Sequence, residues 1–498
     1  MAEIFLSLKN ISKHYMGIAA LDHVDFKINI GEIHCLVGEN GSGKSTLIKI
    51  ISGTVAPDEG AQITIEGIPV HDFHAIDSIH RGIEIIYQDL SLFPNLSVAE
   101  NIALGEYIAS GKRLINQKNL KKIAREAMDL IGINLPLDAL VGTIAIADQQ
   151  LVAICRALTH NVHLLIMDEP TAALTKKEVD ALLYVVKDMH EKGIATIFVS
   201  HKLDEVMQVA ERVTVLRDGK LVGTFPANDL NDEKLTLLMT GKKVEYTPYI
   251  LPEKQDDPIL ETRALTLQGN FKDINFNLYP GEILGITGLL GSGCTELAMS
   301  LFGVTPPDSG EIFFQNKPVR IRSIQDAIRL GIGYVPEDRL VQGLVMNQSV
   351  KKNLTVTILD DLVTRFKLLD QRKLEAEVIR WVKDLAIKVA STEAPVQTLS
   401  GGNQQRVVLA KWIATHPKIL ILDGPTIGVD VAAKFTMHAT VRKLAQQGIA
   451  IILISEEVPE VYYNCNRVLV MRKGRFVAEF ETQKTTLDEI QSCVDMTN

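Results

Sequence analysis

Apolar and polar residues alternate near the start of the chain, in the runs FLSLKNI (5–11) and LDHVDFKI (21–28). A two-residue period of this kind predicts strands with one buried face. Later runs are shorter and almost entirely apolar, which is typical of strands buried on both faces of a parallel sheet. These runs are LLIM (164–167), TIFV (196–199), ILIL (419–422) and IILI (451–454).

Two charged stretches carry the helical period without any strand pattern, from about Val98 to Leu140 and from about Val350 to Val389. Each predicts a group of amphipathic helices inserted between strands. Strands that alternate with helices in this order predict the α/β class. We therefore expect a parallel sheet with an inserted helical subdomain, and we expect this unit twice.

The expectation of two units comes from an internal repeat. Three segments recur in the same order, the first at an offset of 250 residues and the other two at 255. A period of this length makes each copy a whole domain rather than one unit of a solenoid. The matching segments are 31–46 with 281–296, 167–175 with 422–430, and 212–225 with 467–480.

The joint between the copies is polar and contains Pro248, Pro252 and Pro258. Such a composition is typical of a linker. The expected domains are residues 1–245 and 259–498, with the linker at 246–258.

Composition and charge exclude several classes of protein. The 498 residues are 46% hydrophobic and 23% charged, which is ordinary for a folded chain without long disordered tracts. Five scattered cysteines favour reduced thiols over a disulfide framework or a zinc site. No apolar run reaches the roughly 18 residues of a membrane span, and the N-terminus lacks a secretory signal pattern, so we expect a cytoplasmic protein. A net charge of −9 disfavours nucleic acid as a partner.

The first copy contains the pattern GxxxxGK[ST] between a predicted strand and a predicted helix, which is the context of a P-loop. Its glycines let backbone amides point at phosphates, and the helix N-terminus adds partial positive charge. Lys44 is expected to reach the β and γ phosphates, and the Ser45 hydroxyl to bind Mg²⁺. The predicted nucleotide-binding residues of this loop are Gly38, Glu39, Asn40, Gly41, Ser42, Gly43, Lys44, Ser45 and Thr46.

Two acidic residues follow the apolar run 164–167 directly. Asp168 is placed to hold hydrated Mg²⁺, and Glu169 to polarise an attacking water. An acidic pair after a strand is often only a surface cap, but together with the P-loop it predicts a hydrolytic site.

With these motifs in place, each copy resembles a nucleotide-binding domain of an ATP-binding cassette (ABC) transporter. LSGGNQQRVVLAKWI (399–413) has the form of the ABC signature, and it precedes the strand ILILD. The resemblance covers nearly the whole chain, and the tandem is similar to the fused ATPase subunit of bacterial monosaccharide importers of the ribose, galactose and autoinducer type. It implies two tandem P-loop NTPase domains, each with a helical subdomain, that bind ATP and Mg²⁺.

The resemblance implies roles for further residues of copy one. Gln88 matches the Q-loop glutamine, which touches Mg²⁺ and connects to the permease, so the implied metal ligands are Ser45, Gln88 and Asp168. His201 matches the switch histidine, which joins Lys44 and Glu169 as a catalytic residue, and Tyr15 matches the aromatic that stacks on adenine. Taken alone, Gln88, His201 and Tyr15 could equally be a surface glutamine, a helix cap and a core aromatic. The signature adds Ser400, Gly401, Gly402 and Gln404.

The second copy departs from the family pattern around the phosphates. Cys294 stands where the P-loop lysine is expected, and a thiol cannot replace a cation. Asp423 is kept, but Gly424 takes the place of the catalytic glutamate. The Q-loop and switch positions are Glu337 and Glu456, which add negative charge.

The signature motifs show the reverse distribution, because the altered signature is in copy one and the intact one in copy two. Copy one has Ala145 and Ala147 where copy two has Ser400 and Gly402. ABC domains, by resemblance, pair head to tail, with each ATP between one P-loop and the other domain's signature. Under that pairing all intact motifs fall in one site and all altered ones in the other. We therefore expect one hydrolytic site and one degenerate site within the chain.

Several functions remain open at this point. The first is an ATPase (ATP + H₂O to ADP + phosphate) that docks on separate permease subunits at the cytoplasmic face of the membrane. It would drive import of a sugar-like solute that a solute-binding protein delivers. A nucleoside importer is the alternative, and a soluble tandem ABC protein acting in translation is a further one, disfavoured by the short linker and the altered site. A catalytically inactive protein is disfavoured by the intact motifs of copy one.

Overall fold

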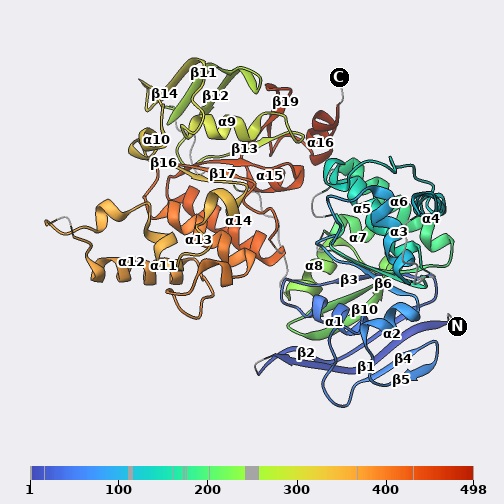
Figure 1. Ribbon diagram of the computed structural model, residues 1–498. Helices are drawn as coiled ribbons and strands as arrows, with labels where there is room; N and C mark the ends of the chain where they lie inside the picture. Colours follow the sequence, from blue (N-terminus) through green and yellow to red (C-terminus); the bar gives the residue numbers. More distant parts are fainter. Residues whose placement is uncertain are drawn as a thin grey trace. The chain divides into compact units, whose positions relative to one another are not determined.

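The computed structural model describes residues 3–15, 17–109, 116–160, 162–171, 174, 176–200, 202–241, 249, 257–366, 368–429 and 431–496. The chain divides into two compact units, Met1–Val244 and Glu245–Asn498. Each unit is considered by itself (Figure 1). Most of the expected linker and His201 lie outside the described residues, so the domain limits 1–245 and 259–498 stay predictions.

Unit 1 contains two sheets. The smaller is antiparallel, with the strand order β2-β1-β4-β5, and the larger has the order β10-β9-β3-β8-β7-β6. The strands are β1 (Ile4–Tyr15), β2 (Ile18–Asn29), β3 (Ile33–Val37), β4 (Gln62–Ile65), β5 (Ile68–Val70), β6 (Ile83–Ile86), β7 (Leu164–Asp168), β8 (Ala195–Val199), β9 (Arg212–Arg217) and β10 (Lys220–Pro226).

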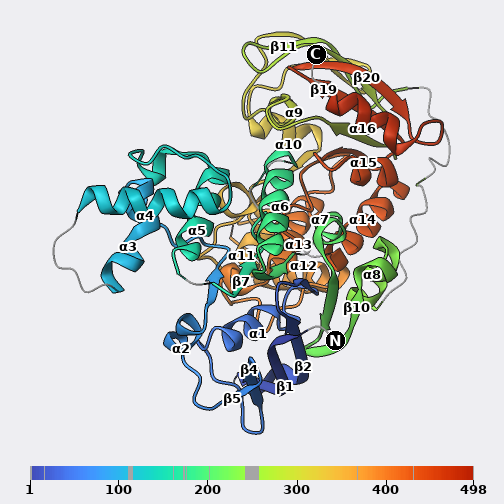
Figure 2. The ribbon, with the colours of Figure 1, turned by 90° about the vertical axis from the view of Figure 1, so that its right-hand side faces the viewer.

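The helices of unit 1 follow from the amphipathic stretches of the sequence. They are α1 (Lys44–Ile51), α2 (Ala75–His80), α3 (Val98–Ala109), α4 (Gln117–Leu130), α5 (Ile146–Leu158), α6 (Lys176–Glu191), α7 (Leu203–Val209) and α8 (Asp232–Thr240). Two short 3₁₀ turns are η1 (Val141–Thr143) and η2 (Ala227–Asp229). In Figure 2, α3, α4 and α5 form a group on one side of unit 1, away from the antiparallel sheet.

Unit 2 repeats this plan, with an antiparallel sheet β12-β11-β14-β15 and a larger sheet β16-β17-β18-β13-β19-β20. Its strands are β11 (Leu260–Leu267), β12 (Phe271–Leu278), β13 (Ile283–Thr287), β14 (Ser309–Phe314), β15 (Lys317–Val319), β16 (Ile332–Val335), β17 (Ile419–Asp423), β18 (Ala450–Ile454), β19 (Arg467–Arg472) and β20 (Arg475–Glu481).

The helices of unit 2 are α9 (Cys294–Leu301), α10 (Ile324–Leu330), α11 (Val350–Thr355), α12 (Gln371–Asp384), α13 (Gly401–Ile413), α14 (Val431–Gln446), α15 (Val458–Asn464) and α16 (Leu487–Asp495). One short π-helical turn, η3 (Arg339–Gly343), and two 3₁₀ turns, η4 (Leu359–Leu362) and η5 (Val396–Thr398), complete the unit. The α/β fold with two tandem domains and inserted helices is confirmed.

The core of each unit lies around the central strands of the larger sheet. Every residue of β3 and β8 is buried, as is every residue of β13 and β18. Strands covered on both faces need apolar side chains at each position, which explains the uninterrupted apolar runs. In β1, by contrast, Leu6 and Leu8 are fully buried and Lys9 is exposed, because this strand has one buried face.

The larger sheet brings the candidate site residues together at one edge. In unit 1, β3, β7 and β8 are parallel neighbours, so their carboxyl ends meet at the same side. Ligands of open α/β sheets bind at this side. The P-loop follows β3, Asp168 ends β7 and Ser200 follows β8. Among the described residues, no helix is long and apolar enough to cross a membrane.

Candidate functional site

Two glycines of the unit 1 P-loop, Gly38 and Gly43, leave no room for a side chain. Gly43 precedes α1 in a left-handed conformation (φ 102°). A Cβ atom there would lie 2.5 Å from the carbonyl oxygen of Ala20. A Cβ atom at Gly38 would lie 2.3 Å from the carbonyl oxygen of Leu216. The loop is therefore packed tightly against β2 and β9, which fixes its curvature.

Lys44 places a positive charge at the centre of this loop. Its amine donates to the carbonyl oxygens of Gly38, at 2.8 Å, and Glu39, at 3.0 Å. The side chain is only 6% exposed. Close by, the hydroxyl of Ser42 is buried without a hydrogen-bond partner. A buried donor next to a held cation fits a loop that receives phosphate oxygens.

Asp168 and Glu169 lie at the end of β7. Burial raises the pKa of Asp168, the charge of Glu169 adds to this effect, and Lys44 and Lys49 oppose it. The backbone of Glu169 is left-handed (φ 50°), a conformation that few residues with side chains adopt. Its amide donates to the carbonyl oxygen of Val199 at 2.9 Å, which links β7 to the end of β8. The glutamate is thus held at a fixed position beside the aspartate.

Three further predicted residues of unit 1, Ser45, Gln88 and Tyr15, are exposed. Gln88 is exposed two residues beyond β6, which is the neighbour of β7. Ser45 is exposed in the first turn of α1. Tyr15 ends β1 and is 44% exposed, so its ring is open to stacking. His201 lies outside the described residues and stays a prediction.

The donor atoms of this site are suited to Mg²⁺. Ser45, Gln88 and Asp168 offer hydroxyl, amide and carboxylate oxygens, the ligand type that Mg²⁺ prefers. Within the described part of the chain, no cluster of three His, Cys, Asp or Glu side chains forms a metal cage. Mg²⁺ usually binds through one or two carboxylates together with substrate phosphates, so the residues fit this ion.

The motifs did not predict a role for Glu205, which is buried next to the segments after β7 and β8. The Glu205 carboxylate accepts from the hydroxyls of Thr171, at 2.6 Å, and Ser200, at 3.0 Å. It also pairs with Lys202 at 3.3 Å. It therefore joins the segment after Glu169 to the segment after β8. The signal was present in the repeat, because Thr426, Ser455 and Glu460 recur at the same spacing in copy two.

In unit 2 the P-loop keeps its shape but loses its charge. Gly293 precedes α9 in the left-handed conformation (φ 104°), as Gly43 does in unit 1. Cys294 is 9% exposed, and its sulfur lies 3.3 Å from the hydroxyl of Ser292. Burial raises the pKa of the Cys294 thiol to about 12. A neutral thiol therefore occupies the position of the phosphate-binding cation.

The acidic residue of β17 is enclosed by hydroxyls of its own unit. Thr295 donates to one oxygen of Asp423 at 3.2 Å, and Tyr334 donates to the other at 3.0 Å. Asp423 is only 2% exposed, and burial raises its pKa to about 6, with a further increase from Glu337. Thr295 stands at the position of Ser45, so the group expected to bind Mg²⁺ is already engaged inside the protein.

Glu337 and Glu456 add negative charge near Asp423 and Cys294. Burial raises the pKa of Glu456, and the charge of Glu337 raises this pKa further. Gly424 has the left-handed backbone (φ 52°) of Glu169, but a Cβ atom there would lie 2.5 Å from Cδ1 of Ile427. The acidic surroundings and the missing cation therefore make this end of the unit 2 sheet unsuited to polyphosphate.

The two signature helices differ at their N-termini. Ser400 occupies the N-cap position of α13 without a side-chain bond to the helix backbone, and its hydroxyl accepts from the side-chain amide of Asn403 at 2.8 Å. Gln404 donates to the carbonyl oxygen of Leu399 at 3.1 Å, and Gly401 and Gly402 form the first turn. A helix N-terminus with small residues is a site for anions. In unit 1, α5 begins after Ala145, which offers no hydroxyl.

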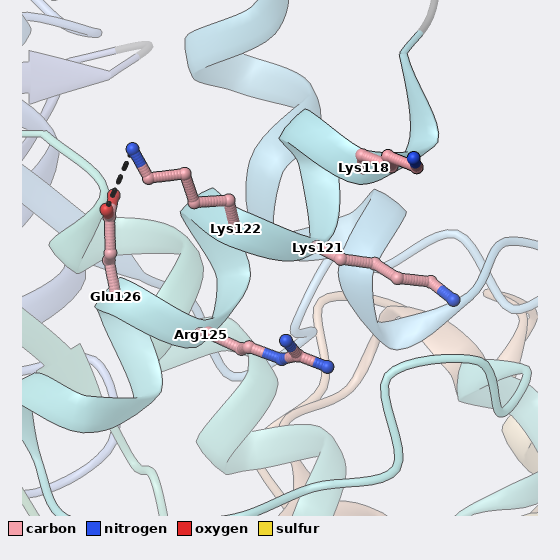
Figure 3. Close-up of a pocket in the computed structure, with 5 residues that line it drawn as sticks. All are labelled: Lys118, Lys121, Lys122, Arg125 and Glu126. Carbon is pink, nitrogen blue, oxygen red and sulfur yellow. Dashed lines mark ion pairs between the residues drawn. The ribbon is translucent and has the colours of Figure 1, made fainter.

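A basic stripe on α4 lines a shallow surface pocket (Figure 3). Its residues are Lys118, Lys121, Lys122, Arg125 and Glu126. Two of the four cations are already paired, Lys121 with Asp138 at 2.6 Å and Lys122 with Glu126 at 3.6 Å. These ion pairs are typical of a solvated helix face.

Comparisons with known proteins agree with these motifs. A family model described as "ABC transporter" matches residues 21–172 and 271–427. The chain is 40% identical over 488 residues to a provisionally named ribose/galactose/methyl galactoside import ATP-binding protein of Agrobacterium fabrum, covering 98% of this chain and 96% of that one. It is 41% identical over 493 residues to a ribose import ATP-binding protein of Corynebacterium glutamicum, covering 98% and 92%. A solved ATP-binding cassette of an ABC transporter, in its ADP conformation, shares 25% identity with a TM-score of 0.43 and covers 48% of this chain and 96% of its own.

Proposed function

Because this chain belongs to the ABC transporter family, we propose that it is the ATP-hydrolysing, energy-coupling subunit of an importer for a monosaccharide or a related sugar-like solute. The activity is that of an ABC ATPase, ATP + H₂O to ADP + phosphate. Relatives at 40% and 41% identity over nearly the whole chain carry the names of ribose and galactose import proteins, which supports this solute class. The nucleoside importer and the translation factor are not favoured by any of these relatives.

We infer one competent ATP site, formed by head-to-tail pairing of the units. The inference rests on how the intact motifs are distributed between the two units. Lys44 with its loop is intact in unit 1, whereas Cys294 is a buried neutral thiol in unit 2. The signature is intact in unit 2, where Ser400 stands at the N-cap position of α13, and altered in unit 1, where Ala145 stands there. Head-to-tail pairing brings the two intact halves into the same site.

The residues of this site divide the work of phosphoryl transfer. Lys44 and the loop amides neutralise charge that develops on the phosphates. Bound Mg²⁺ would be held by Ser45, Gln88 and Asp168, and would supply further neutralisation between the β and γ phosphates. Glu169 orients the attacking water.

The signature half completes the site in the proposed pairing. Ser400 and the N-terminus of α13 donate to the γ-phosphate from the opposite side, with Gly401, Gly402 and Gln404 shaping the approach. His201 is proposed to contact the γ-phosphate, and Tyr15 to stack on adenine. Closure of the two halves assembles the full set of donors, and hydrolysis releases it.

The partners follow from the proposed function. An importer needs integral-membrane permease subunits, which this chain would contact at the cytoplasmic face, and a solute-binding protein that acts through them. The test is ATP-dependent uptake of labelled ribose, galactose and a nucleoside into proteoliposomes that contain the chain and its permease. Sugar uptake that requires Lys44 supports the proposal. Uptake of the nucleoside alone, or co-purification with ribosomes in place of a permease, contradicts it.

A further inference from the structure

The tip of the P-loop in unit 2 presents two leucines to solvent. Leu289 is 54% exposed and Leu290 is 72% exposed. The equivalent positions of unit 1 hold Glu39 and Asn40, which are polar. Adjacent leucines are unfavourable in water, and contiguous exposed apolar groups can mark a contact surface. We refer to Leu289 and Leu290 as the apolar loop tip.

The leucines stand on the same loop backbone that unit 1 has. In unit 2 the amide of Ser292 donates to the carbonyl oxygen of Leu289 at 2.9 Å. In unit 1 the amide of Ser42 donates to the carbonyl oxygen of Glu39 at 3.1 Å. The left-handed glycine before the following helix is also shared, with φ 104° in unit 2 and 102° in unit 1. The two loops therefore differ in the side chains of their tips and not in shape.

The start of the signature helix in unit 1 has changed in the same direction. Its first positions are Ala145 and Ile146, where unit 2 has Ser400 and Gly401. Ala145 is exposed, and Ile146 is 43% exposed. The backbone is again shared, since φ and ψ are −60° and 152° at Ala145 and −63° and 155° at Ser400. We refer to Ala145 and Ile146 as the apolar helix start.

Both apolar surfaces stand where a nucleotide site uses polar groups. P-loops and helix N-termini bind phosphate through amides, hydroxyls and a cation. In unit 2, Cys294 leaves the loop without its cation, and the acidic residues near Asp423 repel phosphate. In unit 1, Ala145 offers no hydroxyl and Ile146 adds a branched apolar side chain. The two altered halves are thus poorly suited to phosphate, but they are suited to each other.

We propose that the apolar loop tip of unit 2 binds the apolar helix start of unit 1, and that this contact holds the degenerate site closed without nucleotide. The inference rests on the proposed function, in which the units pair head to tail. Removal of the leucine and isoleucine side chains from water favours the contact. It takes the place of the ATP that joins the two halves of the site of Lys44. Each turnover then opens and closes the site of Lys44 alone.

Disulfide crosslinking of the full chain tests this contact directly. A disulfide forms only where two Cβ atoms approach within about 4.5 Å, so it reports a closed site. The test pair is Leu290→Cys with Ile146→Cys, in a Cys294→Ala background that removes the thiol of the same loop. This pair should crosslink within one chain in the absence of ATP.

The matched control is the same pair of positions in the competent site, Asn40→Cys with Gly401→Cys. A Cβ atom at Gly401 would lie 3.0 Å from the end of the flexible Arg339 side chain, which can give way. The control pair should crosslink only after addition of ATP, with Glu169→Gln in both backgrounds to preserve the closed state. Without nucleotide, the yield of the test pair should exceed that of the control pair by about tenfold, because only the competent site needs a ligand to close.

A charge swap provides a second measurement that does not depend on thiols. Leu290→Glu should raise the KM for ATP by about tenfold, because an unpaired charge cannot be buried in the contact. Ile146→Lys in the same chain should reverse most of this increase, since the two new charges attract, and a double-mutant cycle measures the coupling. Tyr184→Glu, at a residue of α6 that is 73% exposed, should leave KM unchanged. Thermal unfolding verifies that each variant folds.

The outcomes distinguish this proposal from the proposed function. Equal yields of the test and control pairs without nucleotide would overturn the apolar contact. A crosslink between two chains would also overturn it, because the occupant would then be a second copy. An increase in KM that Ile146→Lys does not reduce would count against it in the same way. Failure of both pairs to crosslink even with ATP would instead overturn the head-to-tail pairing.

Discussion

One position accounts for much of the difference between the two P-loops, because it is Lys44 in unit 1 and Cys294 in unit 2. The ammonium group of Lys44 donates to carbonyl oxygens of its own loop, where it can also bind phosphate oxygens. Cys294, at the same point of unit 2, is buried beside Ser292 and neutral. A cation beside a polyphosphate contributes to transition-state stabilisation in a way that a neutral thiol cannot.

Lys44→Ala and Glu169→Gln are each expected to lower the ATPase kcat by about a thousandfold, because a phosphate cation or the water-orienting carboxylate is lost. Cys294→Ala should change kcat by less than about twofold, since no charge is removed. Steady-state hydrolysis of ATP by the purified chain measures all three. Equal losses in Lys44→Ala and Cys294→Ala would contradict the one-site arrangement.

Gly424→Glu is not expected to restore hydrolysis in the second pocket. The left-handed backbone at position 424 (φ 52°) strains any residue with a side chain, and the cation of the loop would still be missing. The variant should unfold at a lower temperature and show no gain in ATP turnover, measured in a Lys44→Ala background. A clear gain in that background would show that the second pocket is still able to react.

At the scale of elements, a buried carboxylate ties two loops together in each unit. In unit 2, Glu460 on α15 accepts from Thr426 at 2.7 Å and lies 3.0 Å from His438. Burial alone would raise the pKa of Glu460, but hydrogen bonds and the charges of His438 and Lys434 lower it from 4.5 to about 2. The ionised form is therefore part of the folded structure.

This pKa shift predicts acid sensitivity of unit 2. A carboxyl with a lowered pKa contributes stability above pH 4.5 that is lost as pH falls toward 2, because the unfolded chain then binds more protons. Glu460→Gln should destabilise the protein by about 3 kcal/mol near neutral pH. It should also flatten the decline of stability between these pH values, as measured by urea unfolding. The control Glu457→Gln removes an exposed partner of Lys434 and should leave the slope unchanged.

Strands and helices could be predicted from the sequence, but the contacts between distant segments could not. The buried strands and the helical insertions were predictable, since their apolar periods are local properties of the chain. The contacts of Glu205 and Tyr334 were not, because each joins segments that are distant in sequence. Tyr334 meets Asp423 across 89 positions, and only the order of the sheet brings β16 beside β17.

At the scale of the whole molecule, the two units share a fold but differ in their P-loop and signature residues. The candidate residues of the P-loop and signature were readable from motifs, because their glycines and charges are fixed by phosphate geometry. Their assembly into one site depends on pairing of the units, which remains our proposal.

Exchange of one methyl group between the signatures tests this pairing. Gly402→Ala gives α13 the residue that unit 1 has as Ala147, and its Cβ would lie 3.1 Å from that of Ala433, which is crowded. We expect kcat to fall about tenfold or more, because the approach to the γ-phosphate is narrowed. The reverse change, Ala147→Gly, should leave kcat unchanged. A loss caused by Ala147→Gly, or none by Gly402→Ala, would contradict the head-to-tail pairing.

The left-handed backbone shared by Glu169 and Gly424 has a further consequence. A residue with a side chain pays about 1 kcal/mol or more of strain there, whereas glycine adopts this conformation freely. Unit 1 thus keeps a carboxylate, which we propose orients the attacking water, at a strained position, whereas the glycine of unit 2 is relaxed there. Glu169→Gly should accordingly raise the melting temperature relative to Glu169→Ala, while both variants should abolish turnover, so that the residue proposed to orient water also lowers the stability of the fold.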